Sequence, residues 1–351
     1  MKLRRRQFLH LAAGAAALST APRVAWAQSY PAKPVRWIVG FAPAGGNDIV
    51  ARLMGQWLTE RLGQSFVIEN RPGAATNLAA EAAINAAPDG YTLFLANVSN
   101  AINATFYTKL NFDFIRDITP VAAIMRMPNV MLVNPSVPVK TVPEFIAYAK
   151  ANPGKINMAS AGIGSGGHLA GELFKMMTGV NLVHVPFRGN GPALTALLGG
   201  QVEVQFATLA SSVEFIRTGK LRALGITTAK RSEALPDLPA IDDSVKGYEE
   251  SSWYGISAPK GAPANVVQIL NKEVNAALVD PNMKARIANL GGIEMPGTPD
   301  DFGKLIVEET EKWAQRKRMD GWPRLPSTLM NRPKNSLLKP AHLCGLCLPQ
   351  H

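Results

Sequence analysis

The stretch that decides the fold runs from Val35 to Asp48 and reads VRWIVGFAPAGGND. Its first half, Val35–Phe41, is rich in apolar and β-branched residues, which is typical of a buried strand. The second half is a glycine-rich loop, and an apolar stripe at helical spacing follows it up to Leu62. Because the first N–H groups of a helix are unpaired and carry partial positive charge, this loop is a candidate anion site. Asn47 and Asp48 are expected to cap the helix.

Three more units repeat this order of strand, polar or glycine-rich loop, and helix. Ile156–Ser160 precedes AGIGSGG at 161–167, Leu182–Phe187 precedes RGNGP at 188–192, and Thr92–Ala96 precedes NVSN at 97–100. In α/β sheets ligands bind outside the carboxyl ends of the strands, where all four loops are expected to lie. The Asn, Ser, His and Arg side chains of these loops suit a carboxylate or a phosphate. Tight turns without a ligand are the alternative interpretation.

The whole chain alternates strand-like and helix-like segments. Expected strands are Val35–Phe41, Ser65–Glu69, Thr92–Ala96, Val130–Val133, Ile156–Ser160, Leu182–Pro186, Val202–Phe206, Ala223–Thr227 and Gly255–Ala258. Expected helices are Asp48–Leu62, Ala74–Ala86, Ala101–Tyr107, Val142–Ala151, Gly167–Thr178, Pro192–Gly199, Ser211–Thr218, Ala264–Val279, Pro281–Leu290 and Pro299–Gln315. This alternation predicts α/β sheets with helices on both faces. A body of roughly 290 residues exceeds one ordinary core, which predicts two domains.

Residues 1–27 have the features of an export signal. A basic start at 2–6 precedes a weakly apolar, alanine-rich stretch, Phe8–Leu18, and Ala25–Ala27 has the small-x-small pattern of a cleavage site. The stretch is too short to span a bilayer, so we expect cleavage after Ala27 and a periplasmic location. Arg5 and Arg6 resemble a twin-arginine signal, and an ordinary secretory signal is the alternative.

The formal net charge of +11 arises at the two ends of the chain. Residues 1–27 carry five basic and no acidic residues, and residues 316–351 carry seven basic residues and one acidic residue. Subtracting +5 and +6 from +11 leaves a net charge of zero for residues 28–315. A nucleic acid or an anionic membrane surface is therefore not expected as a partner of the folded body.

Residues 316–351 differ in composition from the rest and are expected to form a disordered tail. They contain five prolines and both cysteines of the chain, which form the single motif Cys344-Gly-Leu-Cys347. Metal binding would need a second pair of cysteines or well-placed histidines, and only His342 and His351 lie nearby. No metal site is therefore expected, and the body must be stabilised by packing without disulfides.

Two enzymatic interpretations compete with simple binding. The glycines at 162, 164 and 167 match the dinucleotide fingerprint GxGxxG, but the next strand lacks the acidic residue that follows it in such sites. Arg188 could take a 2′-phosphate instead, so an NADP-binding enzyme stays an alternative. Ser165 and His168 could approach each other as a hydrolase pair, but no acid is placed to orient the histidine. Neither enzymatic activity nor a cofactor is therefore expected.

Five segments, in order, resemble the periplasmic solute-binding proteins of tripartite tricarboxylate transporters, called the Bug family. They read FAPAGGNDIVAR at 41–52, ITPVA at 118–122, SAGIGSGGHLAGELF at 160–174, HVPFRGNGPALTALLGGQVEVQF at 184–206 and SWYGISAP at 252–259. The resemblance covers about Tyr30 to Gln315 and does not extend into residues 316–351. It implies an α/β fold with two lobes, a Venus flytrap of the type II-like periplasmic-binding-protein class. Residues 28–125 with 255–315 would form lobe one, residues 126–254 would form lobe two, and the hinge would lie near Met125–Met127 and Ser252–Gly255.

The resemblance also implies a set of ligand-binding residues, because the family holds its ligand carboxylate largely with backbone amides and ordered water from the glycine loops. Carried over by position, the set is Phe41, Ala42, Ala44, Gly45, Gly46, Asp48, Ser99, Asn100, Ser160, Gly164, Ser165, His168, Arg188, Gly189 and Ala207. Ala44 stands where the family usually has glycine. Ala207 stands where many members have an aspartate that could meet a ligand ammonium, which disfavours amino acids as ligands. A branched side chain at Gly45 is expected to block the ligand.

Together these observations predict an exported binding protein that captures a small carboxylate between two lobes. As the resemblance implies, it would deliver this solute to the membrane subunits of a tripartite tricarboxylate-type transporter, and we expect it to act as a monomer. The alternatives are an exported NADP-binding or hydrolytic enzyme and a receptor-coupled carboxylate sensor that uses the same lobes.

Overall fold

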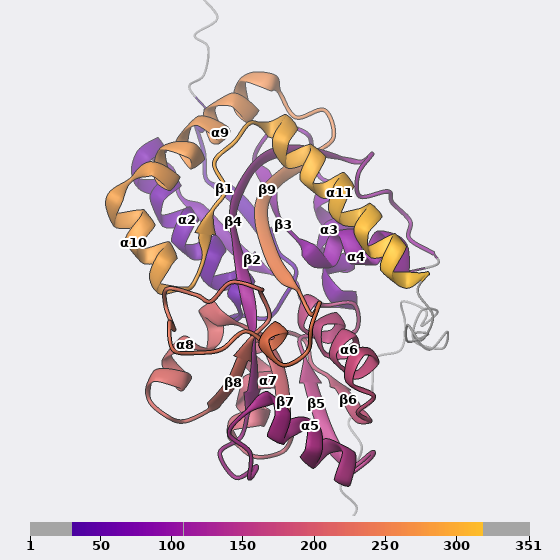
Figure 1. The fold of residues 1–351 in the computed structure, drawn as a ribbon. Helices are drawn as coiled ribbons and strands as arrows, with labels where there is room; N and C mark the ends of the chain where they lie inside the picture. Colours follow the sequence, from indigo (N-terminus) through magenta and orange to yellow (C-terminus); the bar gives the residue numbers. More distant parts are fainter. Residues whose placement is uncertain (1–29, 108, 319–351) are drawn as a thin grey trace, which may run out of the picture.

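The structure is a computed structural model that describes residues 30–107 and 109–318. In these residues one ten-stranded sheet has the order β2-β1-β3-β9-β4-β7-β5-β6, with β8 and β10 also paired to β4. Its strands are β1 Val35–Val39, β2 Phe66–Asn70, β3 Thr92–Asn97, β4 Ile118–Val133, β5 Ile156–Ser160, β6 Leu182–Pro186, β7 Val204–Thr208, β8 Arg222–Ile226, β9 Ser251–Pro259 and β10 Ile293–Glu294. Two long antiparallel strands, β4 and β9, lie side by side in the middle of the sheet (Figure 1).

Helices connect and cover the strands. They are α2 Gly46–Leu62, α3 Asn77–Ile84, α4 Val98–Phe106, α5 Val142–Ala151, α6 Gly166–Thr178, α7 Asn190–Leu198, α8 Leu209–Arg217, α9 Ala264–Val279, α10 Pro281–Asn289 and α11 Pro299–Lys317, with short 3₁₀ turns at Ala74–Thr76 and Ile241–Asp243. Alternate residues of β1 enter different apolar clusters: Ile38 packs in one, and Trp37 and Val39 pack in another. Both faces of the sheet are therefore covered, as the alternating pattern predicted.

The sheet has two halves, each built around parallel strands. In one half β1 pairs with β2 and β3, and in the other half β5 pairs with β6 and β7. β4 links the halves, because its segment 118–128 pairs with β9 and its segment 129–133 pairs with β7 and β8. The change of partner falls between Pro128, opposite Ser251, and Asn129, opposite Thr208. The chain therefore crosses between the halves within three residues of the predicted hinge at Met125–Met127.

The length of β4 corrects the sequence-based prediction, which expected only Val130–Val133 as a strand. The observed strand has 16 residues and contains Pro120 and Pro128, which interrupt a strand pattern because proline cannot donate to a ladder. Register shifts between Pro120 and Ala122 and between Ala123 and Met125 mark irregularities in the pairing with β9. These local adjustments let the strand continue where its sequence argues for an end.

Two predicted helix starts are also corrected. The first helix begins at Gly46 with Gly45 as its N-cap, so Asn47 and Asp48 lie inside its first turn instead of capping it. The helix predicted at Ala74–Ala86 begins with a 3₁₀ turn whose residues Ala74, Ala75 and Thr76 have positive φ angles of 46°, 44° and 79°. Thr76 packs so tightly on Gly40 that a Cβ there would lie 2.5 Å from the Thr76 Cβ. This long-range contact is not visible in the local sequence.

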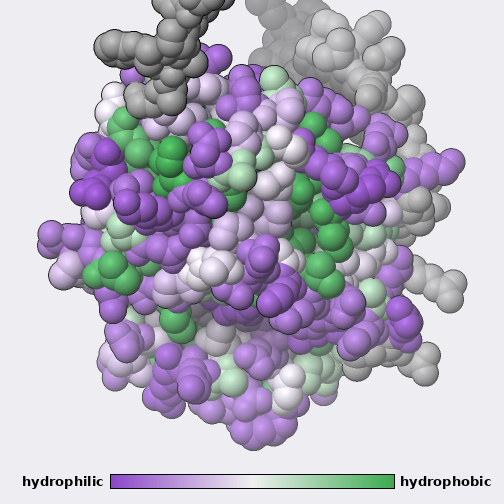
Figure 2. Space-filling view, turned by 90° about the horizontal axis from the view of Figure 1, so that it is seen from above, coloured by the Kyte–Doolittle hydropathy of each residue, from purple (hydrophilic) through white to green (hydrophobic). Residues whose placement is uncertain are grey.

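The surface has no large apolar region on the face drawn in Figure 2. Viewed from the end that carries α9 and α11, the surface is mostly hydrophilic with separate apolar patches, which is usual for a globular protein (Figure 2). No helix in the described part of the chain has the length and the apolar character needed to cross a membrane. Helix α11 continues to Lys317, two residues into the predicted tail. The export signal at 1–27 and residues 319–351 of the tail, with its cysteine motif, lie outside the described residues.

Candidate binding site between the two halves of the sheet

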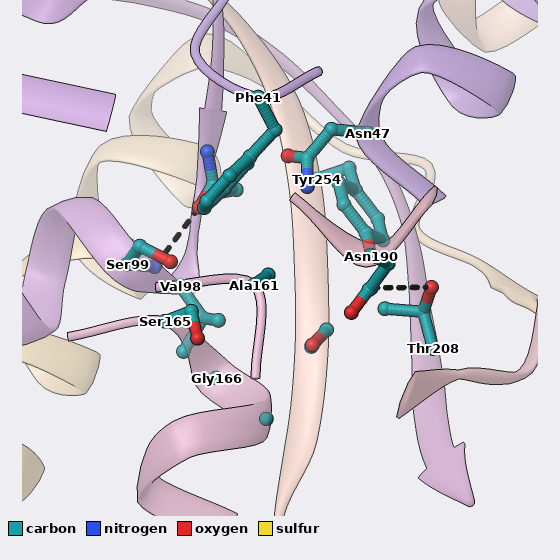
Figure 3. A pocket seen from close by; sticks show the side chains of 13 residues that line it. Phe41, Asn47, Val98, Ser99, Ala161, Ser165, Gly166, Asn190, Thr208 and Tyr254 are labelled. Atoms are coloured by element: carbon teal, nitrogen blue, oxygen red, sulfur yellow. Dashed lines mark hydrogen bonds between the residues drawn. The ribbon is translucent and has the colours of Figure 1, made fainter. Parts of the chain in front are cut away.

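A small cavity of about 20 Å³ lies between the two halves of the sheet (Figure 3). Its lining consists of Phe41, Asn47, Asn97, Val98, Ser99, Ala161, Ser165, Gly166, Gly167, Asn190, Thr208, Ser252 and Tyr254. Residues of both parallel strand groups and of β9 contribute to this lining. None of these residues carries a charged side chain, so recognition in the cavity depends on dipoles and hydrogen bonds.

Five helices begin at this cavity. The N-terminal ends of α2 and α4 come from one half, and those of α6, α7 and α8 come from the other. The first helical hydrogen bonds of α2 and α6 are donated by Ile49 and Leu169, so the N–H groups of Gly46, Gly166 and Gly167 precede the helical ladder. Because helix dipoles place partial positive charge at these ends, they favour an anion in the cavity without a cationic side chain.

The first glycine loop is held by an ion pair and by the opposite half of the molecule. Asp48 Oδ2 accepts hydrogen bonds from Ala44 N at 3.1 Å and from Arg52 Nε at 2.9 Å. Burial opposes ionisation of Asp48, but these hydrogen bonds and the Arg52 charge outweigh it and lower the pKa of its carboxyl. Ala42 N donates to the carbonyl oxygen of Arg188 at 3.0 Å. The N–H groups of Ala42 and Ala44 therefore donate to acceptors within the protein and not to a ligand.

The second glycine loop is held by neutral groups. Ser165 Oγ accepts from His168 N at 3.3 Å, and His168 Nδ1 accepts from Gly164 N at 3.2 Å. The His168 ring stacks on His184, with 4.0 Å between ring centroids, and Ser160 Oγ lies 2.6 Å from His184 Nε2. Burial lowers the pKa of His168 well below its usual value, and burial together with the Lys175 charge lowers the pKa of His184 to about 4. Both imidazoles are therefore neutral near pH 7.

The two halves are in close contact around the cavity. A Cβ placed on Gly46 would lie 2.5 Å from Thr208 Oγ1 and 3.0 Å from Tyr254 Oη. A Cβ placed on Gly189 would lie 3.0 Å from Ala42 N. Real Cβ atoms essentially never come as close as 2.5 Å, so Gly46 allows an approach that no other residue permits without a shift. The structure therefore represents a closed arrangement.

Several polar side chains of the lining are already hydrogen-bonded, whereas the amide oxygen of Asn47 is buried without a partner in the described residues. Asn190 donates to Thr208 Oγ1 and accepts from Gln205 Nε2, each at 3.2 Å, and Asn97 Oδ1 accepts from Ser99 N at 3.0 Å. Asn47 is 7% exposed, and its Oδ1 has no partner among the described residues. A buried amide of this kind costs free energy unless water or a ligand pairs with it.

The structure brings the sequence-predicted residues around one cavity but gives them different positions. Phe41, Ser99 and Ser165 line it. Ala42, Ala44, Gly45, Gly46, Asp48, Gly164, His168 and Gly189 belong to the loops and first helical turns beside it, Asn100 lies in the first turn of α4, and Ser160 ends β5. Arg188 is exposed, and its carbonyl oxygen makes its contact with Ala42. Ala207 is fully buried in β7, next to the lining residue Thr208.

Sequence reasoning did not select ten of the lining residues as ligand-binding. They are Asn47, Asn97, Val98, Ala161, Gly166, Gly167, Asn190, Thr208, Ser252 and Tyr254. Several stand in the polar loops already identified, so a search for every polar residue of those loops would have found Asn47, Asn97 and Asn190. Thr208, Ser252 and Tyr254 carry no comparable local signal, since they reach the cavity through strand pairing around the crossing point.

The geometry gives no support to a hydrolase pair of Ser165 and His168. The serine hydroxyl caps α6 by accepting from a backbone N–H, and the histidine Nδ1 accepts from another backbone N–H. Both side chains therefore hold the loop. Within residues 30–107 and 109–318, no group of three or more His, Cys, Asp or Glu residues is arranged to hold a metal ion.

Known proteins share both the sequence and this architecture. Residues 50–318 match the family described as "Tripartite tricarboxylate transporter family receptor". Protein BugT of Bordetella pertussis is 34% identical over 300 residues, covering 84% of this chain and 91% of that protein. A solved structure of Rpa4515 of R. palustris with adipate has a TM-score of 0.81 and 36% identity, covering 82% of this chain and 97% of that chain.

MatC of Rhodopseudomonas palustris with bound malate gives a TM-score of 0.78 at 33% identity, covering 82% of this chain and 99% of that chain. The resemblance to the Bug family and the predicted two-lobed α/β fold are thus confirmed. The cavity at the helix N-termini, the sheet in two halves and the match over most of the chain all point to one family. The protein belongs to the tripartite tricarboxylate transporter receptor family.

Proposed function

We propose that this protein captures a small carboxylate in the cavity between the halves of its sheet and delivers it to a tripartite membrane transporter. The observation that carries this proposal is the convergence of five helix N-termini on a cavity whose lining residues are uncharged. Unpaired N–H groups at helix starts bind anions, and a carboxylate is an anion that suits this uncharged, polar lining.

The relatives indicate which carboxylates should be tested first. Rpa4515 has been solved with adipate and MatC with malate, and both are small dicarboxylates. We therefore place a dicarboxylate or hydroxydicarboxylate in this cavity. One carboxylate would face the N–H groups of Gly46 and Gly166, and the amide of Asn47 would pair with a second polar group of the ligand.

The sequence-derived ligand set is retained as part of the proposal, with the lining residues added to it. In this set Phe41, Ser99 and Ser165 would contact the ligand, and Gly45, Asp48 and His168 would hold the loops that do so. The lobes would comprise 28–125 with 255–315 and 126–254. Because a ligand between the lobes contacts both of them, binding favours the closed arrangement by its differential affinity.

The same proposal covers location and partners. An export signal at 1–27 would bring the mature protein to the periplasm, where family members act as receptors. The protein would bind and release its solute unchanged, as a monomer, and the membrane subunits would recognise the loaded form.

The test uses mature protein purified without added ligand. Thermal shift and titration calorimetry with malate, adipate, succinate and citrate should show stabilisation and 1:1 binding by at least one acid. Small-angle scattering should show compaction on binding, since the open form has a larger radius. Stabilisation by NADP without stabilisation by any carboxylate would favour the dinucleotide alternative, and ester turnover lost in Ser165→Ala would favour a hydrolase.

A further inference from the structure

A buried carboxyl group, Glu250, lies at the point where the chain crosses between the halves of the sheet. It directly precedes β9 and is 3% exposed. Its Oε2 accepts a hydrogen bond from Asn129 Nδ2, and Asn129 is the first residue of β4 beyond the crossing. Its Oε1 has no partner among the described residues. Glu250 is neither one of the cavity-lining residues nor one of the residues that hold the glycine loops.

Glu250 lies immediately behind the wall of the cavity. A Cβ placed on the lining residue Gly166 would lie 3.2 Å from Glu250 Oε1 and 3.2 Å from Ser252 Oγ. The unpaired carboxyl oxygen therefore faces the first residue of α6, at the end of the helix that attracts anions. Burial raises the pKa of the lining residue Tyr254, and negative charge on Glu250 raises it further. The charge of Glu250 therefore acts on a residue that lines the cavity.

The cations that favour the charged form of Glu250 are engaged by other groups. On α11, Lys312 pairs with Glu309, and Arg316 donates to the Glu249 carbonyl oxygen at 3.0 Å. Arg126 of β4 lies 3.4 Å from Glu309. Among the groups that face Glu250, Lys312 and Arg316 favour its charged form, Glu309 opposes it, and Tyr248 and Tyr254 are neutral neighbours. No ion pair in the described structure neutralises Glu250.

A carboxylate at this position and a bound anion would both compete for the positive end of α6. Two neighbouring carboxyl groups in a buried site cannot both be ionised without a large cost in free energy. One of them avoids that cost by taking up a proton. We propose that Glu250 takes up a proton when the cavity binds its anion, so that capture of the carboxylate is coupled to proton binding. This inference rests on the proposed function and adds a titrating residue to the same site.

The electrostatics of the empty protein agree with this role. Burial raises the pKa of Glu250 to about 7, although the Asn129 hydrogen bond and the charges of Lys312 and Arg316 lower it. Below that pH the group is already protonated, and the affinity for an anion does not depend on it. Above that pH each binding event takes up a proton, so the affinity falls as the pH rises, by up to tenfold per pH unit.

The experiment is titration calorimetry with malate and with adipate, which remain fully ionised between pH 7 and pH 8.5. At pH 8, the observed enthalpy is measured in Tris and in HEPES, whose ionisation enthalpies differ, and the difference gives the number of protons taken up. We expect nearly one proton per ligand in the wild type and none in Glu250→Gln. The dissociation constant of the variant should not change from pH 7 to pH 8.5.

Glu172→Gln is the matched control, because Glu172 is a buried carboxyl on α6 that is ion-paired with Lys175 at 2.9 Å. It should retain the proton uptake of the wild type. If Glu250→Gln fails to fold by circular dichroism, Glu309→Gln takes its place. Loss of that neighbouring negative charge lowers the pKa of Glu250, so proton uptake should begin at a lower pH than in the wild type.

Tight binding without proton uptake in the wild type would overturn the inference and leave the proposed function standing. Equal proton uptake in the wild type and in Glu250→Gln would do the same, since another group would then titrate. Absence of binding of either acid at every pH would contradict the proposed function for these acids, and the inference with it.

Discussion

The two glycine loops of this protein have the same shape but are stabilised in different ways. Both follow a parallel strand and end at the start of a helix that faces the cavity. The first loop is held by the ion pair of Asp48 with Arg52, and the second by Ser165 and the stacked rings of His168 and His184. Buried N–H groups that do not face the ligand must find partners, and either charged or neutral acceptors meet that need.

Each loop also leads into a glycine that the opposite half of the molecule approaches closely. A Cβ on Gly46 would lie 2.5 Å from Thr208 Oγ1, whereas a Cβ on Gly166 would lie 3.1 Å from Val98 Cγ1. The comparison shows that the loops do more than present N–H groups. Their glycines set how far the halves can close, and both loops make a tight contact, since a Cβ on Gly164 of the second loop would lie 2.5 Å from Asn103 Oδ1.

The largest effect is expected for Gly46→Ala. The new methyl group collides with Thr208 and Tyr254 across the cavity, so the closed arrangement loses stability relative to the open one. Overpacking of this kind costs about 1–3 kcal/mol, which predicts carboxylate affinity lower by on the order of 100-fold. Titration calorimetry measures this loss, and small-angle scattering should show that the variant stays open in the presence of ligand.

Gly45→Ala is the matched control for that variant. Its Cβ would have its nearest neighbours at 3.6 Å, which is ordinary contact, and the φ angle of Gly45 is −87°. Affinity should stay within about threefold of the wild type. A loss at Gly45→Ala as large as that at Gly46→Ala would show that the loop backbone, and not the closing contact, controls binding.

A smaller loss is expected for Gly166→Ala. The added Cβ meets Val98, Glu250 and Ser252 at 3.1–3.2 Å, distances that small shifts of these side chains can relieve. We predict an affinity lower by about tenfold, measured by the same titration. If Gly166→Ala weakens binding more than Gly46→Ala does, the contact at Gly166 and not the contact at Gly46 limits closure.

Acid should destabilise the second loop. The pKa of His184 in the folded protein, about 4, lies below the value of about 6.5 in the unfolded chain. The stability this provides is present above pH 6.5 and is lost as the pH falls towards 4. Because His184 is only half-buried, we expect the wild type to lose about 1–2 kcal/mol more than His184→Gln between pH 7 and pH 4.5. Urea unfolding at both pH values measures the difference, and parallel changes in the two proteins would contradict it.

Salt should affect the first loop, and this effect is expected to be the smallest. Arg52 is more than half exposed, so its pair with Asp48 is worth only about 0.5 kcal/mol and is screened by salt. Arg52→Met should lower the melting temperature slightly at low ionic strength and not at 1 M NaCl. A salt-independent difference would mean that packing of the Arg52 stem, and not its charge, stabilises the loop.

Much of the fold could be predicted from local patterns. The strands Ile156–Ser160 and Leu182–Pro186 and the helices Val142–Ala151 and Ala264–Val279 have the expected bounds. These segments have regular apolar periodicity and clear start and stop signals, which act over a few residues. The bounds of the long strand β4 were not predicted correctly. Its prolines resemble strand breaks, and only the pairing with β9 shows that they are tolerated within the strand.

The sequence by itself determined the order of strand, loop and helix units, the glycine loops and the family, because each depends on neighbouring residues. Only the tertiary structure decided which atoms face the cavity and which are hydrogen-bonded within the loops. Thr208, Tyr254 and Glu250 reach the site from distant segments, and Asp48 turns away from it to bind Ala44. Their positions follow from strand register and from the closing of two halves, since such contacts between distant residues leave no periodic pattern in the chain.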